Sequence, residues 1–145
     1  MAERELWSCP RCGRTFANRN QTHTCAAVGG PDALDGRFVR CDPVVRQIFD
    51  ALVHHVEPVD VLVEKSRIAL HIRMSFAAMM PRTHWLDGHL VLARTAAHPS
   101  FRRIEVYSAH NVLHAFRLTE APDAEFLALL AEARDVGEQR HLGRS

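Results

Sequence analysis

Three of the chain's four cysteines lie within its first 25 residues, together with a histidine. Residues 7–25 read W-S-C-P-R-C-G-R-T-F-A-N-R-N-Q-T-H-T-C, so Cys9, Cys12, His23 and Cys25 form a C-x2-C…H-x-C pattern. A C-x2-C turn places two thiolates on one side of a tight knuckle, and two more ligands complete the closed tetrahedron of a structural Zn²⁺ site. We therefore predict a zinc-binding module over residues 1–28 that owes most of its folding free energy to the metal.

Two alternatives to this ligand set remain open. Cys41 can replace His23 in a four-cysteine site, although we prefer His23 because Cys41 stands in C-D-P, directly before a predicted helix. A redox-active C-x2-C is the second alternative. It would open a helix inside a thioredoxin-like βαβ unit, and we predict no strand before Cys9.

Composition limits the class of protein. The first residues, M-A-E-R-E-L-W, contain no apolar signal core, and no run of 18 apolar residues occurs. We therefore expect a cytoplasmic protein without a membrane segment. The formal net charge of +1 excludes a strong field of one sign over the whole molecule.

Residues 29–41 are predicted to form a linker or loop, because Gly29-Gly30-Pro31 interrupts any regular pattern. Phe38 and Val39 are expected to anchor the end of this linker on the domain that follows.

Two helices are expected in that domain, which we place at residues 42–137. Asp42-Pro43 supplies an N-cap and an N1 proline, and the sequence predicts a helix over 43–56. Its apolar stripe comprises Val45, Ile48, Phe49, Leu52 and Val56. The second helix has Pro122 near its start and Gly137 as its C-cap, and its apolar face comprises Phe126, Leu127, Leu130 and Ala133. A charged tail follows over 138–145.

Between the helices the hydrophobic period changes to two, which is typical of strands. Short turns separate the segments, so we expect antiparallel pairing. The predicted fold class is α+β: an antiparallel sheet of 5–6 strands with two helices packed on one face, preceded by the small zinc-binding module. The candidate strands are 59–64, 67–73, 76–80, 88–93, 104–107 and 112–118.

Several blocks of this chain resemble bacterial proteins that carry domain of unknown function 5655 behind a short zinc finger. They are C-P-R-C-G-R-T-F, N-Q-T-H-T-C, I-F-D-A-L, K-S-R-I-A-L-H-I-R and F-A-A-M-M-P-R, within a match from about residue 7 to 136. The resemblance implies a nucleic-acid context, because such domains occur beside nuclease-like domains in larger proteins. Cleavage is not implied, since no nuclease motif is present. One departure is A-R-D-V at residues 133–136, where the family has a common aromatic residue.

Basic side chains are expected on the sheet face that the helices leave uncovered. If the apolar sets face the helices, the other face presents a surface suited to phosphate or carboxylate. The candidate residues are Arg67, His71, Arg73 and Arg117, flanked from loops by Arg82 and the pair Arg102-Arg103. The alternative is a solvated face whose arginines pair with nearby acids. His114 lies on the apolar side and is interpreted as a core histidine with a backbone partner.

No catalytic motif is found, and we lean against an enzyme. The favoured function is a non-enzymatic binding module that contacts nucleic acid or an acidic protein. One alternative is a self-associating structural module, which would make a homo-oligomer. Another is a small-molecule binder or enzyme that uses the arginine- and histidine-lined face.

Overall fold

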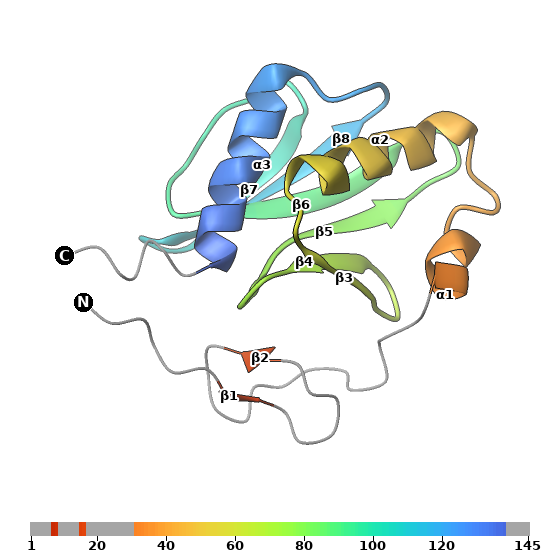
Figure 1. The fold of residues 1–145 in the computed structure, drawn as a ribbon. Helices are drawn as coiled ribbons and strands as arrows, with labels where there is room; N and C mark the ends of the chain where they lie inside the picture. Colours follow the sequence, from red (N-terminus) through yellow and green to blue (C-terminus); the bar gives the residue numbers. More distant parts are fainter. Residues whose placement is uncertain (1–6, 9–14, 17–30, 139–145) are drawn as a thin grey trace.

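The computed structural model describes residues 7–8, 15–16 and 31–138. Six strands form one antiparallel sheet in the order β3-β4-β5-β6-β8-β7, and helices α2 and α3 lie side by side on one of its faces (Figure 1). This arrangement confirms the predicted α+β architecture. The strands are β3 (Asp60–Val63), β4 (Ile68–His71), β5 (Ser75–Pro81), β6 (Leu86–Leu92), β7 (Phe101–Ser108) and β8 (Asn111–Leu118).

Helix α2 spans Pro43–His55. It begins at the predicted residue and ends one residue before the predicted end at residue 56. The residues of its predicted apolar stripe are all buried against the sheet and α3. Asp42 precedes the helix in an extended conformation, but its carboxylate makes no cap hydrogen bond and instead contacts Nδ1 of His84 at 2.6 Å. Among the described residues, no helix has both the length and the apolar content to cross a bilayer.

Helix α3 (Ala124–Gly137) is held to the sheet by an aromatic cluster. The fully buried ring of Phe126 packs edge-on against Phe116, with ring centroids 4.9 Å apart. Gly88 on β6 makes room for this packing, since a Cβ atom there would lie 2.5 Å from the Phe116 ring and 2.6 Å from the carbonyl oxygen of Ala78. The core therefore lies between the two helices and the sheet face that they cover.

The segment predicted as a linker contains a six-residue helix, α1 (Pro31–Gly36), so the prediction of a loop was wrong there. Proline is favoured at the first position of a helix, which explains how Pro31 can begin one after two glycines. Phe38 is buried and its ring lies 5.1 Å from that of Phe49, which confirms it as an anchor. Val39 is 77% exposed, so the prediction that it anchors this segment on the domain was wrong.

The N-terminal part of the chain contributes two short strands, β1 (Trp7–Ser8) and β2 (Thr15–Phe16), which pair antiparallel. The expectation that no strand precedes Cys9 was therefore wrong. The two strands pair antiparallel, whereas the strands of a βαβ unit are parallel, so this pairing does not supply the context of a thioredoxin-like redox motif. The C-x2-C sequence lies between the two strands in the chain.

Candidate functional site

The sheet face opposite α2 and α3, here called the second face, carries one row of side chains that crosses all six strands. Strand register defines the row, because each residue pairs with the next across the sheet and paired residues share a face. It comprises Leu62, Ala69, Ala78, His89, Ala115 and Arg103. Three of the six residues are alanines, of which Ala69 and Ala78 are buried, and the central polar residue of the row is His89.

His89 lies on β6, between Ala78 of β5 and Ala115 of β8. Its Nδ1 atom is buried and makes no hydrogen bond among the described residues. Buried polar atoms usually have a partner. The imidazole therefore retains unused hydrogen-bonding capacity at the centre of the second face.

The electrostatic environment of His89 is positive. Burial lowers its pKa most, and the Arg67 and Arg103 guanidinium groups lower it further, to about 4, against the opposing charge of Glu105. Arg67 precedes β4 and Arg103 lies on β7, so the two arginines approach His89 from opposite sides. Burial thus disfavours a charge of either sign at His89, and the two guanidinium groups add to the bias against a proton.

Both flanking arginines also pair with carboxylates. Arg67 Nε lies 2.7 Å from Glu64, and Arg103 Nε lies 2.6 Å from Glu105. The Arg67 and Arg103 side chains are 38% and 65% exposed. A guanidinium carries five N–H donors, so an ion pair through Nε leaves capacity for a phosphate oxygen.

A second group of charges lies at the end of β5, β6 and β8. Asp87 accepts hydrogen bonds from Arg117 at 2.8 Å and from Arg82 at 3.2 Å, and the Arg117 guanidinium stacks 4.3 Å above the Trp85 ring. Burial alone would raise the pKa of Asp87, but the hydrogen bonds from Arg117 and Arg82 lower it below its ordinary value. This carboxylate offsets the charge of both arginines.

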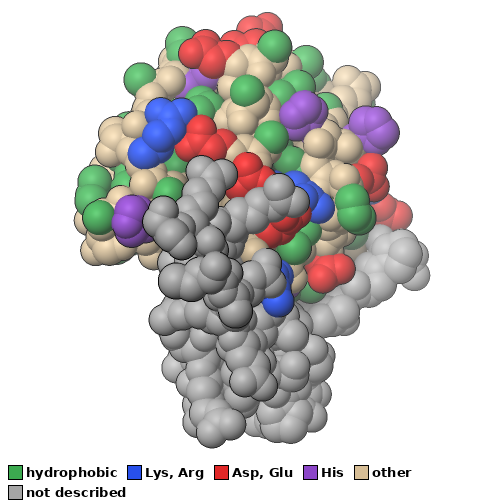
Figure 2. All heavy atoms as spheres, turned by 60° about the vertical axis from the view of Figure 1, so that its left-hand side comes forward, with side chains coloured by type: hydrophobic (Ala, Val, Ile, Leu, Met, Phe, Trp, Pro, Cys, Tyr) green, Lys and Arg blue, Asp and Glu red, His purple; other side chains and the backbone are tan. Residues whose placement is uncertain are grey.

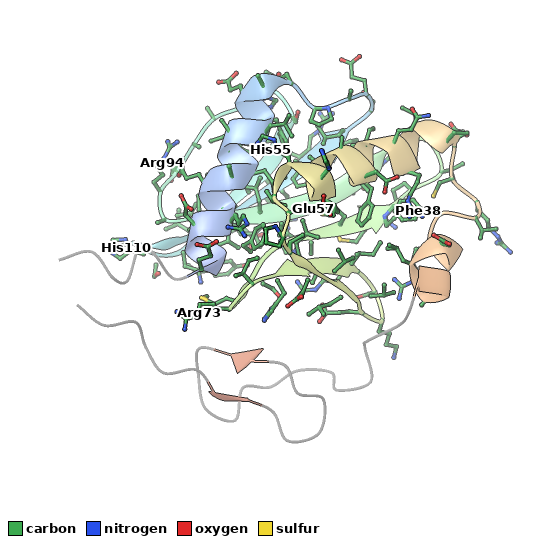
Figure 3. The ribbon with its side chains drawn as sticks, in the orientation of Figure 1. Phe38, His55, Glu57, Arg73, Arg94 and His110 are labelled. Carbon is green, nitrogen blue, oxygen red and sulfur yellow. The ribbon has the colours of Figure 1, made fainter. Side chains whose placement is uncertain are left out.

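The structure brings together some of the predicted residues and separates others. Arg82 and Arg117 share Asp87, as described above, and Arg67 flanks His89. His71 is buried and hydrogen-bonded through Nδ1 to Ser75 at 3.1 Å. Arg73 lies at the β4–β5 connection (Figure 3), where its backbone N–H donates to Gly137.

Sequence reasoning missed His89 of the central row and assigned Arg103, a named flanking residue, to a loop. His89 alternates with Leu90 and Leu92 in a predicted strand, so the period-two pattern could have placed it on the second face. Arg103 was expected in a loop, but β7 begins at Phe101. Figure 2 shows basic and acidic side chains next to one another on the surface that it presents, in line with the net charge of +1.

His114 confirms the prediction of a core histidine. It is fully buried, with Nδ1 3.0 Å from the Val112 carbonyl and Nε2 accepting from the Ala96 N–H at 3.0 Å. This pair of contacts requires the neutral imidazole with its proton on Nδ1. Burial likewise lowers the pKa of His114 below its ordinary value, so the ring has a structural role.

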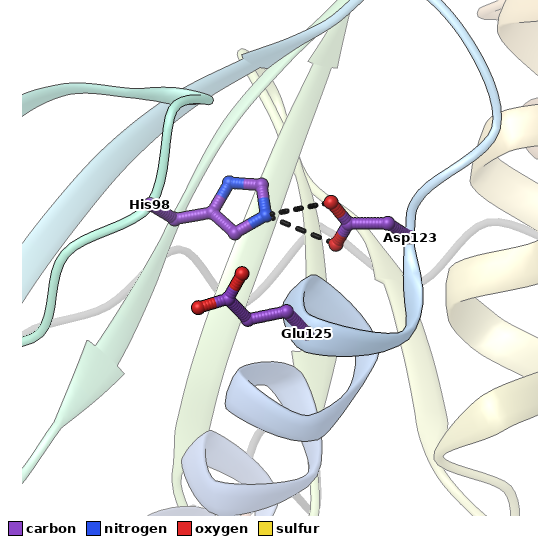
Figure 4. A group of neighbouring side chains, drawn as sticks. All are labelled: His98, Asp123 and Glu125. Carbon is purple, nitrogen blue, oxygen red and sulfur yellow. Dashed lines mark hydrogen bonds and ion pairs between the residues drawn. The ribbon is translucent and has the colours of Figure 1, made fainter.

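His98, Asp123 and Glu125 form the one group of possible metal ligands within the described residues (Figure 4). His98 Nδ1 accepts from the Ser100 N–H at 3.0 Å, so its proton is on Nε2, which faces Asp123 at 3.0 Å. A metal at Nε2 would move that proton to Nδ1 and break the Ser100 bond. Asp123 also caps α3 through the Phe126 N–H, and the geometry favours a helix cap over a metal site.

The predicted zinc ligands Cys9, Cys12, His23 and Cys25 lie outside the described residues, and that site stays a prediction. Cys41, the alternative ligand, is described and half-buried, with Sγ 3.8 Å from the Arg37 carbonyl oxygen. Burial and then the charge of Asp42 raise the pKa of its thiol.

No family model, no curated protein and no solved structure matches this chain. Function is therefore inferred from the residues and their geometry.

Proposed function

We propose that this protein is a non-enzymatic binding module whose second face contacts an anionic partner, with nucleic acid as the favoured class. The observation that carries the proposal is that Arg67 and Arg103 flank His89 on opposite sides of the sheet, each from two strands away, and both act on its charge. Both guanidinium groups reach solvent, and arginine is suited to phosphate oxygens.

One alanine of the central row supports the same proposal. Ala115 of β8 is half-buried and flanks His89, and a side chain this short lets a sugar–phosphate backbone approach the sheet closely on the β8 side. Ala78, on the other side of His89, is buried. Contacts to a sugar–phosphate backbone position a strand without reading its sequence.

We propose further that the N-terminal segment holds one structural Zn²⁺ through Cys9, Cys12, His23 and Cys25. The metal would fold this segment and take no part in chemistry, because four protein ligands leave no open position. Thiolate ligands require a reducing compartment, which is consistent with a cytoplasmic protein.

Binding of a fluorescent 20-nucleotide single strand, measured by anisotropy, tests the proposed face. The affinity is expected to fall with ionic strength, with a slope of about −0.7 per phosphate contact for a single strand. The double variant R67A/R103A should bind about ten-fold more weakly or worse at ~50 mM salt, with a slope shallower by about 1.4.

Arg94→Ala is the matched control. This arginine is also exposed and ion-paired, but its partner is Glu132 of α3, on the helix side of the sheet (Figure 3). Its loss should change neither affinity nor slope. Failure of RNA, single-stranded DNA and duplex DNA to bind at ~50 mM salt would refute nucleic acid as the partner. Equal binding by the wild type and R67A/R103A would refute the face.

A further inference from the structure

The two edges of the sheet differ in how they meet solvent. Edge strand β3 has four residues, of which Leu62 and Val63 are buried. Edge strand β7 has eight residues and carries three exposed large apolar side chains, namely Ile104, Val106 at 65% and Tyr107 at 63%. An edge strand also presents unpaired backbone N–H and C=O groups along one side. The β7 edge is therefore the side of the sheet that can accept another strand.

The charged residues of β7 can form ion pairs when β7 pairs antiparallel with β7 of a second copy. Along a strand, the backbone N–H and C=O groups of alternate residues point to the same edge. In an antiparallel pair, two residues opposite each other either both point these groups at the partner strand or both point them away from it. The two-fold axis that relates β7 to its copy must therefore pass level with a residue and not between two residues, and we call such a register centred on that residue. Centring on Ile104 places Arg103 opposite Glu105 at two symmetric positions. Centring on Arg103 or on Glu105 instead places like charges opposite each other, which is destabilising.

The faces of the sheet on which the β7 side chains lie are consistent with the register centred on Ile104. Arg103 and Glu105 pair with residues of β8 that lie on the second face, whereas Ile104 pairs with His114 on the helix side. In this register the charged pairs therefore meet on one face of the joined sheet and the two Ile104 side chains meet on the other. Within each chain, Arg103 already contacts Glu105 at 2.6 Å, so pairing would create an alternating cluster of four charges.

We propose that β7 pairs antiparallel with β7 of a second copy of this chain, in the register centred on Ile104. The interface is isologous, because the same strand contributes from both copies. Its two-fold axis runs perpendicular to the sheet, so the second faces of both copies lie on the same side and form one continuous surface. This inference goes beyond the proposed anion binding and does not depend on it.

Charge reversal tests the interface by sedimentation velocity over a concentration series, with circular dichroism to check that each variant is folded. The wild type is expected to dimerise. R103E and E105R should each raise the dissociation constant about ten-fold or more, because each places like charges opposite one another twice. The double variant R103E/E105R should recover the wild-type constant. R94E, which reverses an exposed arginine paired with Glu132, should leave it unchanged.

Mixing the two single variants supplies a second test. In a heterodimer of R103E with E105R, two glutamates of one copy face two arginines of the other, so the mixture should associate more tightly than either variant alone. A wild type that stays monomeric at all concentrations would overturn the proposal. So would single variants that dimerise normally, or a mixture that stays monomeric. No nucleic acid is present in this assay, so its outcome is independent of anion binding.

Discussion

Cys12→Ser is expected to reduce the zinc content of the purified protein from about one ion per chain to about none, because it removes one of two thiolates from the knuckle. The N-terminal segment should lose its fold, since metal binding contributes on the order of 10 kcal/mol or more in modules of this kind. The α+β domain should keep its circular dichroism, because the described core lies between α2, α3 and the sheet. Elemental analysis gives the stoichiometry.

Cys41→Ser is the matched control for this variant. Because His23 is the preferred fourth ligand and Cys41 lies directly before α2, replacement of Cys41 should leave the zinc content unchanged. Loss of zinc from Cys41→Ser together with its retention in His23→Ala would establish a four-cysteine site instead. Loss of the entire fold in Cys12→Ser would show that the two parts of the chain are not separable.

Phe126→Ala is expected to lower the free energy of unfolding by about 3–5 kcal/mol, the range for a buried aromatic residue replaced by alanine. The ring is fully buried and contacts Phe116, with further ring contacts to His98 at 5.4 Å and Phe101 at 6.2 Å between centroids. Its removal would leave a cavity where α3 meets the sheet. Urea unfolding of both proteins at one pH measures the difference.

The exposed Val39 offers a control of similar chemistry. Val39→Ala should change the free energy of unfolding by no more than about 0.5 kcal/mol, as is usual for surface positions. A loss below about 1 kcal/mol in Phe126→Ala would contradict the packing of α3 described above.

Much of the fold could be predicted because local and periodic signals agree. Helix α2 has a proline start and a stripe of apolar residues at three- and four-residue steps, and both point to the same bounds. Helix α1 was missed, because six residues are too few to show a helical period and its segment follows two glycines. The start of β7 was missed for a related reason, since Arg102-Arg103 suggested a loop.

The candidate site was harder to predict, because it depends on register. His89 is flanked by Ala78 and Ala115 only because β6 pairs with β5 on one side and β8 on the other. Strand order then decides that Arg67 and Arg103 approach the same imidazole from opposite edges. One sequence shows which face a residue takes but not which strands are neighbours.

The most direct test of the proposed function is the pKa of His89, followed by nuclear magnetic resonance of the imidazole in the free protein and with a single-stranded oligonucleotide. The free protein should give a pKa of about 4, and Arg67→Ala should raise it, because a positive neighbour is removed. A saturating oligonucleotide at low salt should raise the pKa by about one unit or more, since a nearby anion favours the imidazolium. A bound oligonucleotide that leaves the pKa of His89 unchanged would contradict the account.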